Sequence, residues 1–304
     1  MDILLEILIN DIFPIFLVAG LGWLLAWRLR TDAKLFSQVA VHALLPGLIF
    51  QTFITTQVNL IETGRMVLFC LLVVTASGVI AHLIAQGLHL DRASTIGVMV
   101  VVMFTNVGNF GLPLAAFAFG DAALAHATVY FVVMNILLYT AGVALFSGGR
   151  LKWSQALTEL LHQPILYSIF LAGLVRLLNI QLPSPVLRSV DLLAKAAIPA
   201  MLLVLGMRLY QSRIEWKPVL WLAVLLRLVI VPVVVIPLGY ALQLSGPAMQ
   251  AGMLQAATPV GVSTTLLATE YEVKPDFVNS AVFLSTLLCA LTLTPLIMVF
   301  RQLR

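Results

Sequence analysis

Charged residues are scarce in this sequence. Asp, Glu, Lys and Arg make up 10% of its 304 residues, and 61% of the residues are hydrophobic. A soluble domain carries roughly 25% charged residues, and a soluble fold of this length could not bury so much apolar surface. The composition therefore excludes a soluble globular protein and predicts a chain whose solvent is mostly the lipid bilayer. The net charge of +4 comes from loop lysines and arginines, so we expect no nucleic-acid partner.

Cysteine is also scarce, and the motifs of catalytic proteins are missing. Cys70 and Cys289 lie inside apolar runs and are too few for a metal site. Gly108 and Gly111 do not form a nucleotide-binding fingerprint, because no strand precedes them. The sequence has no His-Glu-x-x-His, Gly-x-Ser-x-Gly or phosphate-binding-loop motif. We therefore expect no enzymatic activity, no cofactor and no metal.

Long apolar runs fill most of the chain. A helix needs about 20 apolar residues to cross a bilayer core, and ten segments of roughly this length occur, at residues 7–27, 35–56, 65–87, 93–119, 122–146, 164–180, 187–209, 217–242, 247–269 and 277–300. The expected fold class is an all-α integral membrane protein with about ten transmembrane helices. The longest connector, residues 147–163, has room for a short interfacial helix.

The distribution of Lys and Arg predicts the orientation, because cytoplasmic loops carry the excess of these residues. If the N-terminus is outside, the inner connectors hold ten of the 17 and the outer connectors with the C-terminus hold four. The remaining three, Arg176, Lys195 and Arg227, fall within expected spans. The count favours both termini outside and places the 147–163 connector in the cytoplasm.

An internal repeat occurs at a constant offset of 153 residues. It relates the first, second and fourth segments to the sixth, seventh and ninth. The matched positions are Ala19-Gly20-Leu21 with Ala172-Gly173-Leu174, His42, Ala43 and Pro46 with Lys195, Ala196 and Pro199, and Thr105, Val107 and Gly108 with Thr258, Val260 and Gly261. Because five helices is an odd number, the second copy must insert upside down. The repeat predicts two inverted five-helix units, residues 1–146 and 164–304, joined by the connector.

The fourth and ninth segments contain residues that interrupt helices at matching places. Glycine relaxes the backbone and proline removes a hydrogen-bond donor, and backbone freed in a membrane must be buried or line a cavity. The start of a helix attracts carboxylates. We therefore predict two broken helices that bind a small organic anion, although a kinked structural helix is the alternative. The candidate residues are Asn106, Gly108, Asn109, Pro113, Thr258, Pro259, Gly261 and Ser263.

Ionisable residues inside membrane spans are functional candidates by default. Lys195 and His42 are repeat mates, and each precedes a proline by four residues, or about one helical turn. Lys195 is a candidate counter-charge for the anion, and His42 is a candidate polar or proton-sensitive contact. The alternatives are that Lys195 extends to the membrane surface and that His42 binds a neighbouring helix. Arg227 lies nearer the middle of its span, and the sequence names no partner for it.

Several stretches resemble the auxin efflux carrier family of the bile, arsenite and riboflavin transporter superfamily. They are residues 255–261 (QAATPVG), residues 268–276 (ATEYEVKPD), Gly111-Leu112-Pro113-Leu114 before Gly120, and Pro199 followed by Leu205-Gly206-Met207-Arg208-Leu209. The resemblance spans the chain. The short connector between the fifth and sixth segments is similar to that of bacterial permeases, which implies a bacterial inner-membrane protein.

The resemblance implies a scaffold of helices 1, 2, 6 and 7 and a moving transport domain of helices 3–5 and 8–10, with an elevator mechanism. Substrate would lie beside the crossover of helices 4 and 9, near Asn106 and Pro259. Thr105 departs from the family pattern, because plant carriers have proline there. The implied substrates are auxin-like acids or dicarboxylates such as malate and malonate.

Two alternative functions stay open at this point. One is a sodium-coupled symporter of the bile-acid-transporter type, although the broken segments contain no acidic residue. Another is a membrane sensor or scaffold without transport, which would usually carry an added signalling domain. The sequence also leaves open coupling to protons or sodium and assembly as a homodimer.

Overall fold

The computed structural model describes residues 2–30, 33–56, 59–148, 158, 160–212 and 214–302. Within these ranges the chain is almost entirely helical, and its single strand-like pairing is an isolated bridge between Thr105 and Val260. The first half contains α1 (Asp2–Ile7), η1 (Leu8–Ile12), α2 (Phe13–Leu29), α3 (Ala33–Val39), η2 (Ala40–Leu44), α4 (Leu45–Thr55), α5 (Leu60–Gly87), α6 (Arg92–Met103), η3 (Val107–Gly111), α7 (Leu112–Leu137), η4 (Leu138–Gly142) and α8 (Val143–Phe146), where η marks a π-helical turn.

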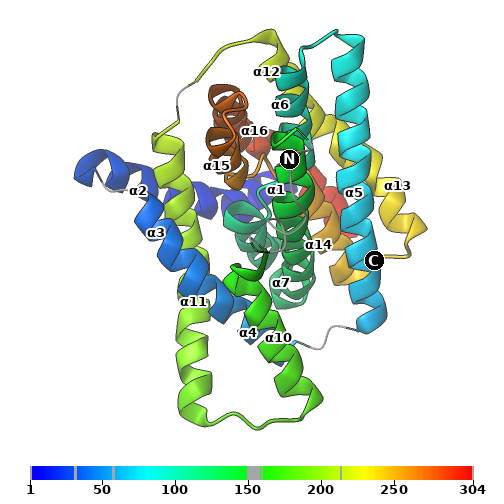
Figure 1. Cartoon of the computed structure of the whole chain (residues 1–304). Coiled ribbons are helices and arrows are strands. Elements are labelled where there is room, and N and C mark those ends of the chain that lie inside the picture. Colours follow the sequence, from blue (N-terminus) through cyan, green and yellow to red (C-terminus); the bar gives the residue numbers. More distant parts are fainter. Residues whose placement is uncertain are drawn as a thin grey trace.

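The second half is also built from helices (Figure 1). It contains α10 (Pro164–Leu177), α11 (Ser184–Tyr210), α12 (Pro218–Leu225), η5 (Leu226–Ile230), α13 (Val231–Ala241), α14 (Gly246–Ala257), α15 (Ser263–Glu270) and α16 (Pro275–Gln302). Residues 149–157 and 159 of the expected connector lie outside the described residues, and so does Trp153 of the short interfacial helix expected through Trp153 and Leu160. Thr158, Leu160 and Leu161 are described and are helical.

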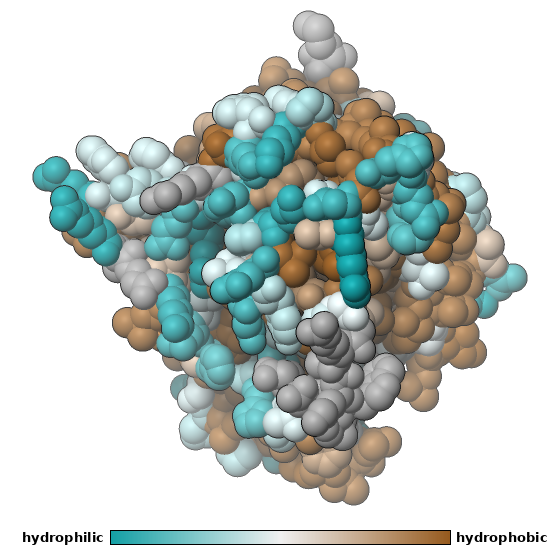
Figure 2. Space-filling view, turned by 45° about the horizontal axis from the view of Figure 1, so that its top comes forward, coloured by the Kyte–Doolittle hydropathy of each residue, from teal (hydrophilic) through white to brown (hydrophobic). Residues whose placement is uncertain are grey.

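The described chain is a multi-pass membrane protein. Seven helical stretches are long and apolar enough to cross a bilayer, and α6 and α10 are shorter apolar helices. Figure 2 shows hydrophobic residues along the flanks and hydrophilic residues gathered on the face that lies at the top of Figure 1. This division suits a lipid environment around the flanks, because lipid tails cannot solvate polar groups.

The helix boundaries differ from the expected segments in two ways. The break predicted in the fourth segment lies between Met103 and Val107, but the chain also turns at Gly120, where φ is 77° and ψ is −168°. Only glycine adopts that conformation readily. The expected segment 164–180 is only 14 residues long as α10, which is shorter than the roughly 20 residues of a perpendicular span.

α2 and α11 pack against each other with unusually close backbones. A Cβ atom placed on Gly206 would lie 1.7 Å from the carbonyl oxygen of Ala19, and one placed on Gly22 would lie 2.1 Å from that of Leu203. α4 packs against both α10 and α11, and α10 and α11 form the hairpin at the bottom of Figure 1. These glycines are needed because no side chain fits between the two backbones.

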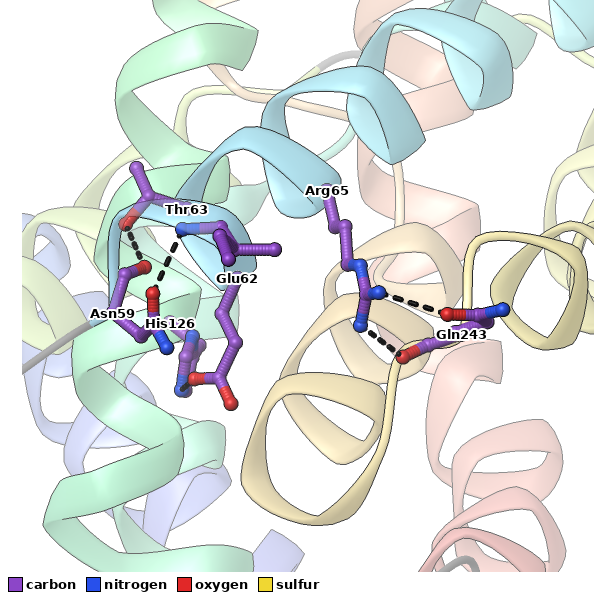
Figure 3. A network of polar contacts seen from close by, with 7 residues as sticks. Asn59, Glu62, Thr63, Arg65, His126 and Gln243 are labelled. Atoms are coloured by element: carbon purple, nitrogen blue, oxygen red, sulfur yellow. Dashed lines mark hydrogen bonds and ion pairs between the residues drawn. The ribbon is translucent and has the colours of Figure 1, made fainter.

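The remaining long helices pack mainly against one another. α14 lies along α7, and α5 packs against α6 and α7. At one end of α5, both Nη atoms of Arg65 donate to Gln243 after α13, at 3.1 and 2.8 Å, and Glu62 lies 3.5 Å from Nε2 of the buried His126 on α7 (Figure 3). These contacts hold α5, α7 and the α13–α14 loop together.

Candidate functional site

The two helix interruptions meet and satisfy each other's backbone groups. Asn106 donates its backbone N–H to the carbonyl of Pro259 at 2.7 Å, and Gly261 donates to the carbonyl of Phe104 at 2.9 Å. The pairing is antiparallel and centres on Thr105 and Val260. Backbone groups outside a helix need such partners in a membrane. The departure from helical geometry at both places is therefore compensated within the protein.

Neighbouring side chains complete this pairing. The Thr105 hydroxyl donates to the carbonyl of Gln255 at 3.2 Å, and the backbone N–H of Val260 donates to the Ser285 hydroxyl of α16 at 3.0 Å. Gly261 must be small, since a Cβ there would lie 2.9 Å from the carbonyl oxygen of Thr105. The Thr105 side chain therefore links the first interruption to the last turn of α14.

Gln255 connects three elements around the interruptions and was not a candidate from the sequence. It is fully buried in α14, and its Nε2 donates to the carbonyls of Val107 and Ala127, each at 3.2 Å. Gly111 is the residue that makes room for it, because a Cβ there would lie 2.0 Å from Gln255 Oε1. The signal in the sequence is an amide inside a mostly apolar helix, and such a group needs hydrogen-bond partners when it is buried.

A cavity of about 100 Å³ opens beside the paired interruptions. A single buried water needs roughly 10–15 Å³, so the space accommodates a small molecule. One side is formed by both interruptions and by α7, and the other by α3, η2 and α11. The polar lining residues are Ser37, Thr105, Asn106, Asn109, Asn135, Tyr139, Gln163, Arg208, Ser263 and Thr264.

Two helical segments begin at this cavity. η3 begins at Val107 and continues into α7, and α15 begins at Ser263. The first N–H groups of a helix have no partner within the helix and carry partial positive charge. Nδ2 of the buried Asn106 has no hydrogen-bond partner among the described residues. At the start of α15 the N–H groups of Thr264 and Thr265 already donate to the carbonyls of Gly261 and Val262. The donors that remain for a ligand are therefore at the start of η3 and in the side chains of the lining, an arrangement that suits a carboxylate.

Arg208 supplies a positive charge to the cavity and was not among the sequence candidates. It lies half-buried in the last turn of α11 and lines the cavity together with Met201 and Val204. Its guanidinium suits carboxylates, because its planar donors match two oxygens at once. The available signal was its place in the stretch Leu205–Leu209, which had contributed only to the family resemblance.

The structure brings together half of the predicted site residues. Asn106, Gly108, Asn109, Gly261 and Ser263 all line the cavity. Pro113, Thr258 and Pro259 are close in sequence to residues that line the cavity, but they do not line it themselves. Thr258 is fully buried and its hydroxyl donates to the carbonyl of Gln255 at 2.8 Å, so its contacts support the interruption.

Lys195 and His42 do not line the cavity. The Lys195 side chain is 72% exposed, and its ammonium lies 2.7 Å from the carboxylate of Asp191 one turn earlier. Nine residues separate Lys195 from the cavity-lining Val204, so the two lie on opposite faces of α11 at 3.6 residues per turn. His42 is exposed and its Nδ1 lies 3.0 Å from the carbonyl of Gln38. Arg208, and not Lys195, is the cationic residue of α11 that lines the cavity, and the role of Lys195 as a counter-charge stays a prediction.

Apolar helices with paired interruptions beside a polar cavity are typical of membrane transporters. The chain belongs to the family described as membrane transport protein, whose family model matches residues 7–297. This match confirms the resemblance to the auxin efflux carriers seen in the sequence.

Similar proteins carry transporter names. The chain is 26% identical to an "Uncharacterized transporter" of Methanothermobacter thermautotrophicus, with 86% of this chain and 87% of that protein covered. It is 23% identical to an "Uncharacterized transporter" of Methanocaldococcus jannaschii, with 84% and 85% covered. It is 26% identical to a "Putative malonate transporter" of Rhizobium meliloti, with 86% and 85% covered.

Proposed function

We propose that this protein is a secondary transporter of small organic anions, with short dicarboxylates such as malonate as its first candidate substrates. The single observation that carries the proposal is the cavity at which η3 and α15 both begin and which Arg208 and Asn106 line. Two carboxylates on a short chain can each meet one group of donors. The name of the Rhizobium relative agrees with this substrate class.

The architecture we propose is ten transmembrane helices in two inverted five-helix repeats, residues 1–146 and 164–304, whose crossover is the meeting of the two interruptions. The 153-residue offset supports it, because the repeat mates Thr105 and Thr258 both lie in these interruptions. Inverted repeats place substrate sites at such broken helices. The proposed orientation has both termini outside the cell.

The proposed mechanism is an elevator movement. α2, α4, α10 and α11 pack on one another, and the cavity lies between the elements α3, η2 and α11 on one side and η3, α7 and α15 on the other. A substrate bound to the interruptions would move with them past α11. Arg208 would then contact the anion in only one of the two positions.

Binding and uptake test the proposal. Purified protein in liposomes should take up radiolabelled malonate, and Arg208→Gln should weaken malonate binding by about 10- to 100-fold, since a hydrogen bond to a charged group contributes about 1.5–3 kcal/mol. Lys195→Gln, on the exposed face of the same helix, is the matched control and should bind as the wild type does. Asn106→Ala should weaken binding without loss of expression.

Two outcomes would contradict different parts of the proposal. Absence of uptake for malonate, malate and aromatic acids alike would remove the organic-anion assignment. A loss of binding in Lys195→Gln together with normal binding in Arg208→Gln would return the counter-charge to Lys195 and move the site away from the cavity.

A further inference from the structure

Arg227 is the largest fully buried side chain among the described residues, and its charge has no counter-charge there. It lies in the π-helical turn η5, inside the apolar stretch Pro218–Ala241. Its Nη1 donates to the backbone carbonyl of Val102 at 2.8 Å, while Nε and Nη2 have no hydrogen-bond partner among the described residues. Within those residues no carboxylate lies within ion-pair distance of it.

A cation removed from water in this way is strongly unfavourable unless a negative potential compensates it. The compensation comes from the end of α6. Val102 is the next-to-last residue of this helix, and the last carbonyls of a helix have no partner within it and carry partial negative charge. The guanidinium therefore occupies the place where a positive charge is most favourable near the interruption.

In transporters built from broken helices, the carboxyl ends of half-helices and the unwound carbonyls coordinate the coupling cation. Here a guanidinium of the chain itself meets the carboxyl end of α6. Val102 precedes Asn106 by four residues, and Phe104, Thr105 and Asn106 all line the cavity, whereas Arg227 does not. Arg227 is therefore a positioning residue behind the interruption, with no direct contact to substrate.

We propose that Arg227 is a built-in cation that replaces a coupling metal ion at the carboxyl end of α6, so that the interrupted helices hold their binding geometry without sodium. The statement that Arg227 stands in for a coupling ion rests on the proposed transport function. It predicts that wild-type protein needs no sodium for stability or for anion binding. It also predicts that removal of this charge makes the protein responsive to an added cation.

A pair of substitutions separates the charge from the hydrogen bond. Arg227→Lys keeps the charge but loses the planar donors, whereas Arg227→Gln keeps an amide donor for Val102 and loses the charge. If the charge matters, the melting temperature of purified protein should fall less in Arg227→Lys than in Arg227→Gln. A role in hydrogen bonding and packing alone gives the opposite order. Arg188→Gln, at an exposed position of α11, is the matched control.

Melting temperatures measured in sodium chloride and in choline chloride provide the second readout. The wild type, Arg188→Gln and Arg227→Lys should melt at the same temperature in both salts. Arg227→Gln should gain about 2–4 °C in sodium or millimolar guanidinium relative to choline. A higher melting temperature for Arg227→Gln than for Arg227→Lys, or no cation response in Arg227→Gln, overturns the proposal.

These melts contain no substrate, so they distinguish the two proposals. A cation response in Arg227→Gln without any carboxylate uptake by the wild type supports the built-in cation and rejects the substrate class. If Arg227→Gln cannot be purified, melting and malonate-binding measurements on the wild type test the proposal. Equal melting temperature and equal malonate binding in sodium and choline support the proposal, and a requirement for sodium contradicts it.

Discussion

The close approach of the α2 and α11 backbones at Gly206 leads to a specific prediction for Gly206→Ala. A Cβ at this position would lie 1.7 Å from the Ala19 carbonyl oxygen and 2.7 Å from the Trp23 nitrogen, both in the backbone of α2. Ordinary contact begins at about 3.4 Å, so α2 and α11 must separate by about 1.7 Å. Overpacking usually costs about 1–3 kcal/mol, and we expect the upper end because a backbone cannot rotate out of the way.

The expected effect is large enough to measure in detergent. A loss of about 3 kcal/mol corresponds to a fall of roughly 6–12 °C in melting temperature, at about 2–4 °C per kcal/mol for a chain of this size class. Gly20→Ala on the partner helix α2 is the matched control, since a Cβ there meets nothing within 4 Å. It should leave the melting temperature unchanged or raise it slightly, because alanine favours the helix by about 0.5–1 kcal/mol.

A melting temperature of Gly206→Ala within about 2 °C of the wild type would refute this reasoning. It would mean that α2 and α11 separate without loss, and that their close contact does not hold this part of the fold. A fall of equal size in Gly20→Ala would instead show that a glycine-to-alanine change destabilises the protein without any steric contact, which would remove the steric explanation.

Three further predictions concern single contacts. Asp11→Asn breaks the 2.7 Å ion pair with Arg301 and should lower stability by about 1–3 kcal/mol, below the value for a fully buried pair because the Arg301 side chain is 36% exposed; an unchanged melting temperature would contradict this. Hydrogen bonds from Ser94 hold the pKa of Asp91, at the start of α6, below its ordinary value, so the ionised form contributes stability above pH about 3.9 that is lost as the pH falls through the lowered pKa. The difference in melting temperature between wild type and Asp91→Asn should therefore shrink at acidic pH, and a difference independent of pH would count against it. Gln255→Leu removes two hydrogen bonds, to the carbonyls of Val107 and Ala127, and should cost about 0.5–1.5 kcal/mol for each bond and reduce uptake; normal uptake and melting would show that the amide is dispensable.

The places where the helices break were readable from the residues themselves. Pro259 cannot donate to a preceding turn, and Gly261 tolerates the close approach of Thr105. In the fourth segment the polar pair Thr105 and Asn106 marks the break, whereas Pro113 begins a regular helix, at α7. Because η3 continues directly into α7, Pro113 lies inside a helical run just after a π-helical turn, and not at the place where the helix breaks. This position explains why Pro113 is not part of the interruption.

The partners of the buried polar groups were not readable. Gln255 donates to residues 148 and 128 positions away, and Arg227 donates to one 125 positions away. The sequence marks both as polar residues in apolar helices, which must find partners. It does not say where those partners lie, because they are backbone carbonyls and every residue carries one.

The sequence by itself determined the solvent of this protein, its helical class and the two sites of interruption, because these follow from local composition and backbone chemistry. The tertiary structure alone decided which polar residues face the cavity. Lys195 and Arg208 both lie on α11, but the rotation of α11 is set by its packing against α2 through Gly206 and Ala19. That packing turns Arg208 toward the interruptions and leaves Lys195 exposed beside Asp191. Helical periodicity relates faces to one another, and only the neighbouring helix determines which face is inside.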